Sequence, residues 1–330
     1  MIILAQIGCG YWGPNLLRSF SANNNCRVKY LLDSSQERRR YVSQNFPLTV
    51  AVESITTILE DPEVQGVIIA TPAESHFRLA KQAMLAGKHV FVEKPLATKV
   101  SEVDELGKIS STLGLIVMVG HTFLYNQAVR YVKSLIDNGD LGDVRYIYSQ
   151  RLNLGRIRSD IDALWNFAPH DISIVQYWLG DPEPTNVQRC GMDYIQSGID
   201  DVVFLNIRYQ DKTMANIHVS WLDPQKTRKM VIVGSKKMVV YDDSADTKIA
   251  IYDKGIDRIA VLGENMDYDR PQAYTFEHRS GDILMPQIPS TEPLKLEAAH
   301  FVECIVGNTP PLTGIAHARK VVSILEQAGK

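Results

Sequence analysis

The sequence predicts an α/β protein in which an N-terminal Rossmann dinucleotide-binding domain precedes an α+β domain with an open, mostly antiparallel sheet. Through residues 2–120, short apolar runs alternate with helix patterns, which is typical of a parallel sheet covered by helices. Beyond residue 140, many segments instead alternate between apolar and polar residues, as antiparallel strands do. We expect the domains to be residues 1–122 and 123–330.

The composition is that of an ordinary globular protein. The chain has 330 residues, of which 45% are hydrophobic and 22% are charged. A net charge of −3 gives no reason to expect nucleic-acid binding. No apolar stretch reaches the ~20 residues that cross a bilayer. The four cysteines are scattered without metal-ligand spacing, and the N-terminus lacks a signal-peptide pattern, so we expect a cytoplasmic protein with no metal site and no membrane partner.

A glycine-rich turn follows the first predicted strand, Ile2–Ile7. It reads Gly8-Cys9-Gly10-Tyr11-Trp12-Gly13, and a helix pattern begins at Pro14. In such a strand–turn–helix, the first glycine permits the tight turn, the second lets the backbone approach a pyrophosphate, and the third lets helix and strand pack closely. The helix N-terminus offers free N–H groups to the phosphates. We therefore expect Gly8, Gly10, Tyr11, Trp12 and Gly13 to bind a dinucleotide.

The next predicted strand, residues 27–32, ends at Asp33. An acidic residue there accepts hydrogen bonds from the adenosine ribose hydroxyls and repels a 2′-phosphate. Asp33 thus favours NAD over NADP. Arg38, Arg39 and Arg40 follow closely and could still accommodate a phosphate, so NADP remains the less favoured alternative.

A predicted βαβ unit carries the main candidate residues. Apolar runs at 67–70 and 89–92 flank a helix pattern, and ligands bind beyond the carboxyl ends of such strands. Thr71 and Pro72 follow the first run, and Glu93 and Lys94 follow the second. We expect all four to border the cofactor, although Lys94-Pro95 alone could also be a simple turn. His76, near the start of the helix, either faces the nicotinamide or caps the helix. Further strands are expected at 48–52 and 116–119, and helices at 55–59 and 101–113.

The second half predicts strands at 144–152, 187–192, 202–209, 214–221, 229–233 and 238–241, and helices at 126–137, 294–305 and 315–328. We expect the last helix, about residues 314–329, to pack on the first domain. The open face of the sheet would bind substrate or a second subunit. Residues 252–291 have little periodicity, which predicts loop with short strands.

One predicted helix has catalytic potential. Residues 164–171 lead into a helix pattern at 172–179, and Asn166 and His170 share a helix face unless Pro169 interrupts it. A histidine can accept the proton of an alcohol as hydride leaves. Alternatively, His170 merely caps the helix. We also expect Tyr125, shortly after the sixth strand, to bind substrate.

Arg156 and Arg158 lie in the segment before this helix. Arginine forks suit phosphate oxygens, which favours a diphosphate in the substrate. The alternative is that they form solvated salt bridges with Asp160 and Asp162.

Over essentially its whole length, the chain resembles the glucose–fructose oxidoreductase / inositol dehydrogenase / MocA (Gfo/Idh/MocA) family. The resemblance rests on the motifs Gly8–Gly13, Asp33, 71–76, Glu93-Lys94-Pro95, Gly120-His121 and 169–171. The resemblance implies a hydrogen bond from Lys94 to the reacting hydroxyl and a catalytic acid/base role for His170. It also implies a homodimer or homotetramer formed through the C-terminal sheets.

Many members of that family carry Asp where this chain has Asn166, and Asn cannot stabilise an imidazolium by ionising. We therefore expect Asn166 to bind substrate or to orient His170. The resemblance extends to 3-dehydrogenases of nucleotide-linked N-acetyl sugars. We therefore expect an NAD-dependent dehydrogenase that oxidises a UDP-type N-acetylated sugar at C3. The alternatives are a free sugar or inositol dehydrogenase, and a non-catalytic NAD-bound sensor or scaffold.

Overall fold

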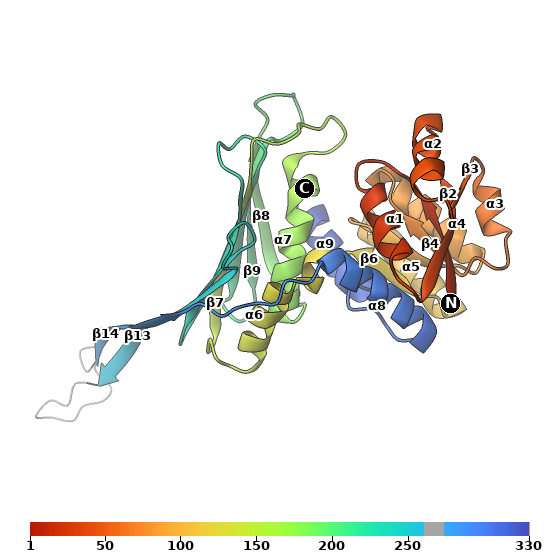
Figure 1. Cartoon of the computed structure of the whole chain (residues 1–330). Helices are drawn as coiled ribbons and strands as arrows, with labels where there is room; N and C mark the ends of the chain where they lie inside the picture. The colour runs from red at the N-terminus through yellow and green to blue at the C-terminus, as the bar shows by residue number, and fades with distance from the viewer. Residues whose placement is uncertain (261–273, 330) are drawn as a thin grey trace, which may run out of the picture. The chain divides into compact units, whose positions relative to one another are not determined.

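The structure, a computed structural model, describes residues 1–260 and 274–329 (Figure 1). The chain forms two compact units. The first contains Met1–Asn126, Leu164–Pro182 and Ser290–Lys330, and the second contains Gln127–Ala163 and Glu183–Pro289. This division differs from the single boundary at residue 122 that the sequence suggested. Two later segments of the chain, residues 164–182 and 290–330, thus belong to the first unit.

The sheet of the first unit is parallel throughout, in the order β3-β2-β1-β4-β5-β6. Its strands are β1 (Ile2–Ile7), β2 (Cys26–Leu32), β3 (Val50–Val52), β4 (Gly66–Ile69), β5 (His89–Glu93) and β6 (Val117–Gly120). The strand order reverses between β1 and β4, which is where doubly wound sheets bind their ligands. The predicted Rossmann fold is confirmed.

The helical elements of this unit are α1 (Gly13–Ser21), α2 (Gln36–Asn45), α3 (Ile55–Leu59), η1 (Ala73–Ser75), α4 (His76–Leu85), α5 (Val100–Leu113), η2 (Thr122–Tyr125), α7 (Ala163–Leu179), α8 (Pro293–Gly307) and α9 (Ile315–Ala328). Helices α4, α5 and α9 pack on the sheet through one apolar cluster, which includes Met84, Leu106 and Val322. Helix α9 contacts both α5 and β6. The last helix therefore belongs to the core of the N-terminal unit.

Helix α8 closes another part of this core through three phenylalanines. Phe20 of α1, Phe91 of β5 and Phe301 of α8 pack edge to face, with ring centroids 5.6, 5.7 and 6.1 Å apart. All three rings are fully buried. Phe20 and Phe301, which are 281 positions apart in the chain, thus share one aromatic core.

The sequence analysis did not identify α2. Its sequence is QERRRYVSQN, and Val42 is its one buried residue, so the helix has no apolar stripe to reveal it. The Ser35 hydroxyl accepts a hydrogen bond from the Arg38 backbone N–H and thereby caps the helix. The position of α2 matters because it carries Arg38 and Arg39.

The second unit contains a mostly antiparallel sheet in the order β14-β13-β12-β11-β7-β10-β9-β8, with β7 and β10 as a parallel pair. Its elements are α6 (Gln127–Asp137), β7 (Val144–Leu152), β8 (Pro184–Met192), β9 (Val202–Tyr209), β10 (Met214–Ser220), β11 (Thr227–Gly234), β12 (Met238–Asp242), β13 (Ile249–Ala260) and β14 (Tyr274–Leu284). The predicted antiparallel character is confirmed.

The expectation of loop over residues 252–291 is wrong for much of that segment. β13 and β14 form a long antiparallel hairpin at the edge of the second sheet (Figure 1). Exposed apolar residues such as Ile256 and Phe276 lie along it, so the usual alternation of one buried and one solvated face is missing. Residues 261–273, which the same expectation covered, lie outside the described residues.

Within residues 1–260 and 274–329, no helix has the length and apolar content that a membrane crossing requires.

Candidate active site

The glycine-rich turn connects β1 to α1 in a conformation that only glycine allows. Gly8 has a φ of +97°, and a Cβ there would lie 2.4 Å from the Ala70 carbonyl oxygen. A Cβ on Gly13 would lie 2.7 Å from the Gly8 oxygen. At Gly10, by contrast, the nearest atom would be 3.8 Å away, on Arg38. The turn is therefore closely packed at both ends and open at Gly10, where a pyrophosphate must approach the backbone.

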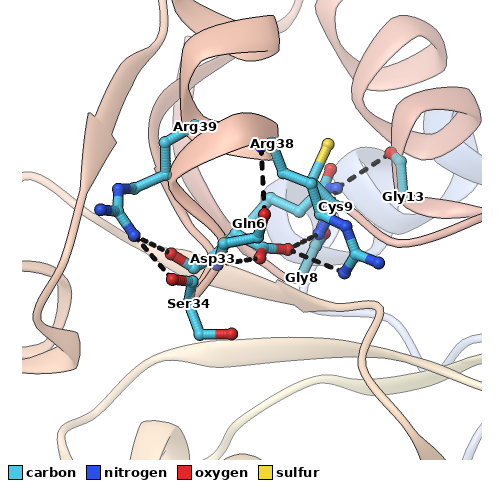
Figure 2. Close-up of polar contacts among 9 residues, drawn as sticks. Gln6, Gly8, Cys9, Gly13, Asp33, Ser34, Arg38 and Arg39 are labelled. Carbon is cyan, nitrogen blue, oxygen red and sulfur yellow. Dashed lines mark hydrogen bonds and ion pairs between the residues drawn. The ribbon is translucent and has the colours of Figure 1, made fainter.

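Gln6, which the sequence analysis missed, stabilises this turn through side-chain hydrogen bonds. Its side-chain Nε2 donates to the carbonyl oxygens of Gly8, at 2.8 Å, and Gly13, at 2.9 Å (Figure 2). Gln6 is fully buried in β1. A polar residue inside an apolar strand was the available signal, because a buried amide needs hydrogen-bond partners.

Asp33 lies at the end of β2, as predicted, and its carboxylate binds back to the glycine turn. Oδ2 accepts a 2.7 Å hydrogen bond from the Cys9 N–H, and Oδ1 accepts one of 2.8 Å from the Ser35 N–H. The Arg38 guanidinium is 3.6 Å from Oδ2 and remains half exposed (Figure 2). Arg39 turns away and donates to the backbone oxygens of Asp33 and Ser34.

The residues that follow β4 form a second hydrogen-bonded turn. The Thr71 and Ser75 hydroxyl oxygens are 2.6 Å apart, and Ser75 donates to the Pro72 oxygen. His76 is buried, with Nδ1 2.7 Å from the Pro95 oxygen and Nε2 2.8 Å from the Thr71 oxygen. Burial lowers its pKa, and the nearby charge of Lys94 lowers it further. Both ring nitrogens of His76 thus face backbone oxygens, at the ends of β4 and β5, and its contact with the cofactor stays a prediction.

Lys94, which follows β5, contacts the helix that carries His170 and Asn166. Its Nζ donates a 2.8 Å hydrogen bond to the backbone oxygen of Asn166. Helix α7 runs unbroken through Pro169, so Asn166 and His170 lie one turn apart on one face. The His170 ring packs edge to face on Phe123 of η2, with centroids 5.1 Å apart. Lys94, Asn166 and His170 are all partly exposed, and the structure brings them together within the first unit.

Helix α7 is held in place by a buried histidine that gave no sequence signal. His317 of α9 has Nε2 2.9 Å from the Ser173 hydroxyl and Nδ1 2.8 Å from the Asp181 carboxylate. Its ring also packs against His121, at the end of β6. Burial lowers the pKa of His121 well below its usual value, and the charges of His317 and Lys94 act in the same direction.

Tyr125, which the sequence analysis assigned to substrate binding, is hydrogen-bonded within the first unit, and its contact with substrate stays a prediction. Its side chain is fully buried, and its hydroxyl oxygen lies 2.8 Å from Nδ1 of His300 in α8. Tyr125 therefore contributes to the packing of η2 on α8. An aromatic residue with a polar atom suits either role, and sequence alone cannot distinguish them.

Arg156 and Arg158 belong to the second unit. Arg158 forms a two-pronged ion pair with Asp160, at 2.9 and 2.5 Å. Asp162 pairs instead with Arg189, at 2.7 Å. The hydrogen bond with Arg158 lowers the pKa of Asp160, and the charge of Arg156 contributes. The alternative that the sequence left open, a solvated salt bridge, is therefore present between Arg158 and Asp160. Both side chains are exposed, so the pair contributes little to stability.

The first unit has the features that a dinucleotide requires. Gly10 leaves the backbone of the turn accessible, α1 begins immediately afterwards at Gly13, and Asp33 lies at the adjacent strand end. Tyr11 is highly exposed and Trp12 partly so, which leaves both available to a ligand. These residues fit NAD, with its pyrophosphate at the N-terminus of α1.

Known proteins share this architecture. Residues 3–121 match the model of the oxidoreductase family with an NAD-binding Rossmann fold, and residues 129–240 match the GFO/IDH/MocA C-terminal domain. A 2,7-anhydro-N-acetylneuraminate hydratase of Mediterraneibacter gnavus is 25% identical over 96% of this chain and 86% of its own length. A UDP-N-acetylglucosamine 3-dehydrogenase of Acidithiobacillus ferrooxidans is 27% identical over 76% of each chain.

The solved structure of the UDP-N-acetylglucosamine 3-dehydrogenase GnnA from Acidithiobacillus ferrooxidans has the same fold. It superimposes with a TM-score of 0.81 at 23% identity and covers 99% of this chain and 97% of its own. With both of its domains matched, the chain belongs to the Gfo/Idh/MocA family of NAD-binding oxidoreductases.

Proposed function

We propose that the protein is an NAD-dependent dehydrogenase that transfers hydride between the cofactor and C3 of a nucleotide-activated, N-acetylated sugar. The observation that carries this proposal is the position of Lys94, whose Nζ lies 2.8 Å from the Asn166 oxygen on the helix that bears His170. A lysine and a histidine on adjacent elements provide a hydrogen-bond donor and a base for one hydroxyl group.

In this proposal NAD supplies the hydride acceptor, C4 of the nicotinamide. Lys94 donates a hydrogen bond to the carbinol oxygen and stabilises its developing negative charge. His170 takes the hydroxyl proton, either directly or through Lys94. Asn166 holds Lys94 through its backbone oxygen and can present its amide to the substrate.

A diphosphate in the substrate is supported by Arg156 and Arg158. Bidentate binding to phosphate would compete well with the exposed Arg158–Asp160 pair. The 3-dehydrogenase relative acts on a UDP-N-acetyl sugar. The other relative, at a similar identity, is named as a hydratase and not as a dehydrogenase, so the reaction of this chain is tested directly below.

The experiment is to incubate the protein with NAD and, separately, UDP-N-acetylglucosamine, its uronic acid and free myo-inositol, while following the absorbance of NADH. Deuterium at C3 of the reactive nucleotide sugar should appear in the reduced cofactor. If inositol is the one substrate that yields NADH, the proposed dehydrogenase activity stands, but the proposed diphosphate site is wrong. A third outcome is that NAD binds, but neither the sugars with NAD nor the 3-keto sugar with NADH react. That outcome would favour a non-catalytic sensor.

We also propose that the exposed face of the second sheet pairs with a second copy of the chain, giving a homodimer or homotetramer. The strand registers place Tyr146 and Tyr148 of β7, Phe204 of β9 and His218 of β10 on one face. The two tyrosine rings stack, as do Phe204 and His218, whose centroids are 4.1 Å apart. Tyr148→Arg should lower the oligomeric mass in solution, and an unchanged mass would contradict this pairing.

We propose that the enzyme works in the cytoplasm, where NAD and nucleotide sugars would both be available to it.

A further inference from the structure

The short 3₁₀ turn η2, which follows β6, is attached to α8 by two side-chain hydrogen bonds. The Thr122 hydroxyl donates a 2.7 Å bond to Glu297 Oε2, and the Tyr125 hydroxyl oxygen lies 2.8 Å from His300 Nδ1. The side chains of Glu297 and Tyr125 are fully buried. Both bonds lie within the first unit and therefore join two of its own elements.

The two bonds have the same spacing on both elements. Thr122 and Tyr125 are three positions apart, and a 3₁₀ helix has three residues per turn, so both side chains lie on one face of η2. Glu297 and His300 are also three positions apart, which places them on one face of α8. Two bonds side by side fix the rotation of η2 about its own axis as well as its distance from α8.

Another face of η2 contacts the candidate base. Successive residues of a 3₁₀ helix are about 120° apart, so Phe123 projects to a different side from Thr122. Its ring packs edge to face on the imidazole of His170 in α7, with centroids 5.1 Å apart and ring planes at 65°. Both side chains are partly exposed. The rotation of η2 therefore determines where the Phe123 ring meets His170.

We propose that Phe123 is a positioning residue for His170, and that Glu297 and His300 hold η2 so that the Phe123 ring keeps the imidazole in one orientation. The torsion that turns a histidine ring about its Cβ–Cγ bond is broad, so the ring orientation depends on what packs against it. A turned ring presents a different nitrogen to the substrate. The catalytic consequence rests on the proposed function, in which His170 takes the hydroxyl proton.

Both hydrogen bonds can be removed without emptying the core. Two hydroxyl-deletion variants do this: Thr122→Val removes the donor to Glu297, and Tyr125→Phe removes the hydroxyl bonded to His300. Glu297→Gln is the conservative variant, because its amide oxygen still accepts a bond from Thr122. Burial raises the pKa of Glu297 well above its usual value, so a neutral amide is a close substitute for the protonated carboxyl. Glu303→Gln, at an exposed position on the same helix, is the control.

The direct test is NMR spectroscopy of the cofactor-free protein with isotope-labelled histidine. The chain has eight histidines, and His170→Gln identifies the ring signal of His170 by its loss. Phe123→Leu should shift this signal, because an adjacent aromatic ring displaces the resonances of nearby protons. The two hydroxyl-deletion variants should shift or broaden it as well, since they release η2 from α8. Glu297→Gln and Glu303→Gln should leave it at the wild-type position.

Turnover gives a second readout. With UDP-N-acetylglucosamine, Phe123→Leu and the two hydroxyl-deletion variants should lower kcat about tenfold and leave the KM for NAD unchanged, because a misoriented base transfers the proton less well. A wild-type His170 signal in Phe123→Leu or in both hydroxyl-deletion variants would overturn the positioning role, even in a protein that oxidises the sugar. Shifted signals with an unchanged kcat would overturn its part in catalysis. Shifted signals in a protein that turns over no sugar would overturn the proposed reaction and leave the positioning of His170 standing.

Discussion

The Lys94 ammonium donates a 2.8 Å hydrogen bond to the backbone carbonyl of Asn166, one helical turn before His170. This contact joins the carboxyl end of β5 to α7, and the bonds from His317 to Ser173 and Asp181 fix α7 in turn against α9. Two candidate catalytic groups, Lys94 and His170, are therefore positioned relative to one another by rigid elements.

Gln6 should affect cofactor binding without touching the cofactor. Gln6→Met removes the two hydrogen bonds that hold Gly8 and Gly13 and leaves their oxygens with one donor fewer. We expect a loss of about 1–3 kcal/mol in unfolding free energy and weaker NAD binding, with a smaller change in kcat. Calorimetric titration with NAD measures the affinity, and the exposed Gln36→Met is the control. NAD affinity equal to wild type would contradict this role.

Arg38 should determine how well the protein tolerates NADP. Its guanidinium lies 3.6 Å from the Asp33 carboxylate, at the strand end where a 2′-phosphate would approach. Arg38→Ala should reduce residual NADP-dependent turnover about tenfold and leave NAD-dependent turnover much less affected, because only the phosphate needs the cation. Arg40→Ala, on the same helix, is the matched control. Equal losses with both cofactors would assign Arg38 a structural role only.

Arg156 and Arg158 should affect the KM of a nucleotide sugar. Replacing both with Ala removes the proposed diphosphate contacts, and we expect KM to rise at least about tenfold. Initial rates with UDP-N-acetylglucosamine measure this change. An Asp160→Asn variant should not raise KM, since it releases Arg158 from its ion pair. An unchanged KM in the double variant would contradict the diphosphate site.

The parts of the fold that depend on local pattern could be predicted, and the parts that depend on distant packing could not. The glycine turn, Asp33 and the strand ends follow from short motifs with a fixed backbone geometry. The return of α8 rests on the contact of Phe301 with Phe20 and Phe91, which no local pattern encodes. The sequences of helix α2 and of the β13–β14 hairpin do not alternate regularly between buried apolar and exposed polar residues. The sequence pattern therefore did not predict these elements.

The residues of the candidate site also divide into those with a local sequence pattern and those that depend on distant contacts. Lys94 stood out because it follows a buried strand, whereas the contact of Tyr125 with His300 could not be foreseen, because the two residues are 175 positions apart. Glu297 of α8 is buried, and its carboxylate accepts a hydrogen bond from the Thr122 hydroxyl. It did leave a signal, because it is an acidic residue in the apolar helix sequence LKLEAAHFVECIV. A buried acid needs a partner or a proton, and such residues often belong to functional sites.

The most direct test of the proposed function compares wild type with Lys94→Met, a side chain of similar length without charge. Turnover is followed as NADH formation with UDP-N-acetylglucosamine, and NAD binding is followed separately by calorimetry. Lys99→Met, in the same loop but exposed, is the control. We predict that Lys94→Met lowers kcat on the order of 10²–10³-fold while NAD still binds, because the developing charge on the carbinol oxygen loses its donor. Near-normal turnover by Lys94→Met would contradict the proposed role of Lys94.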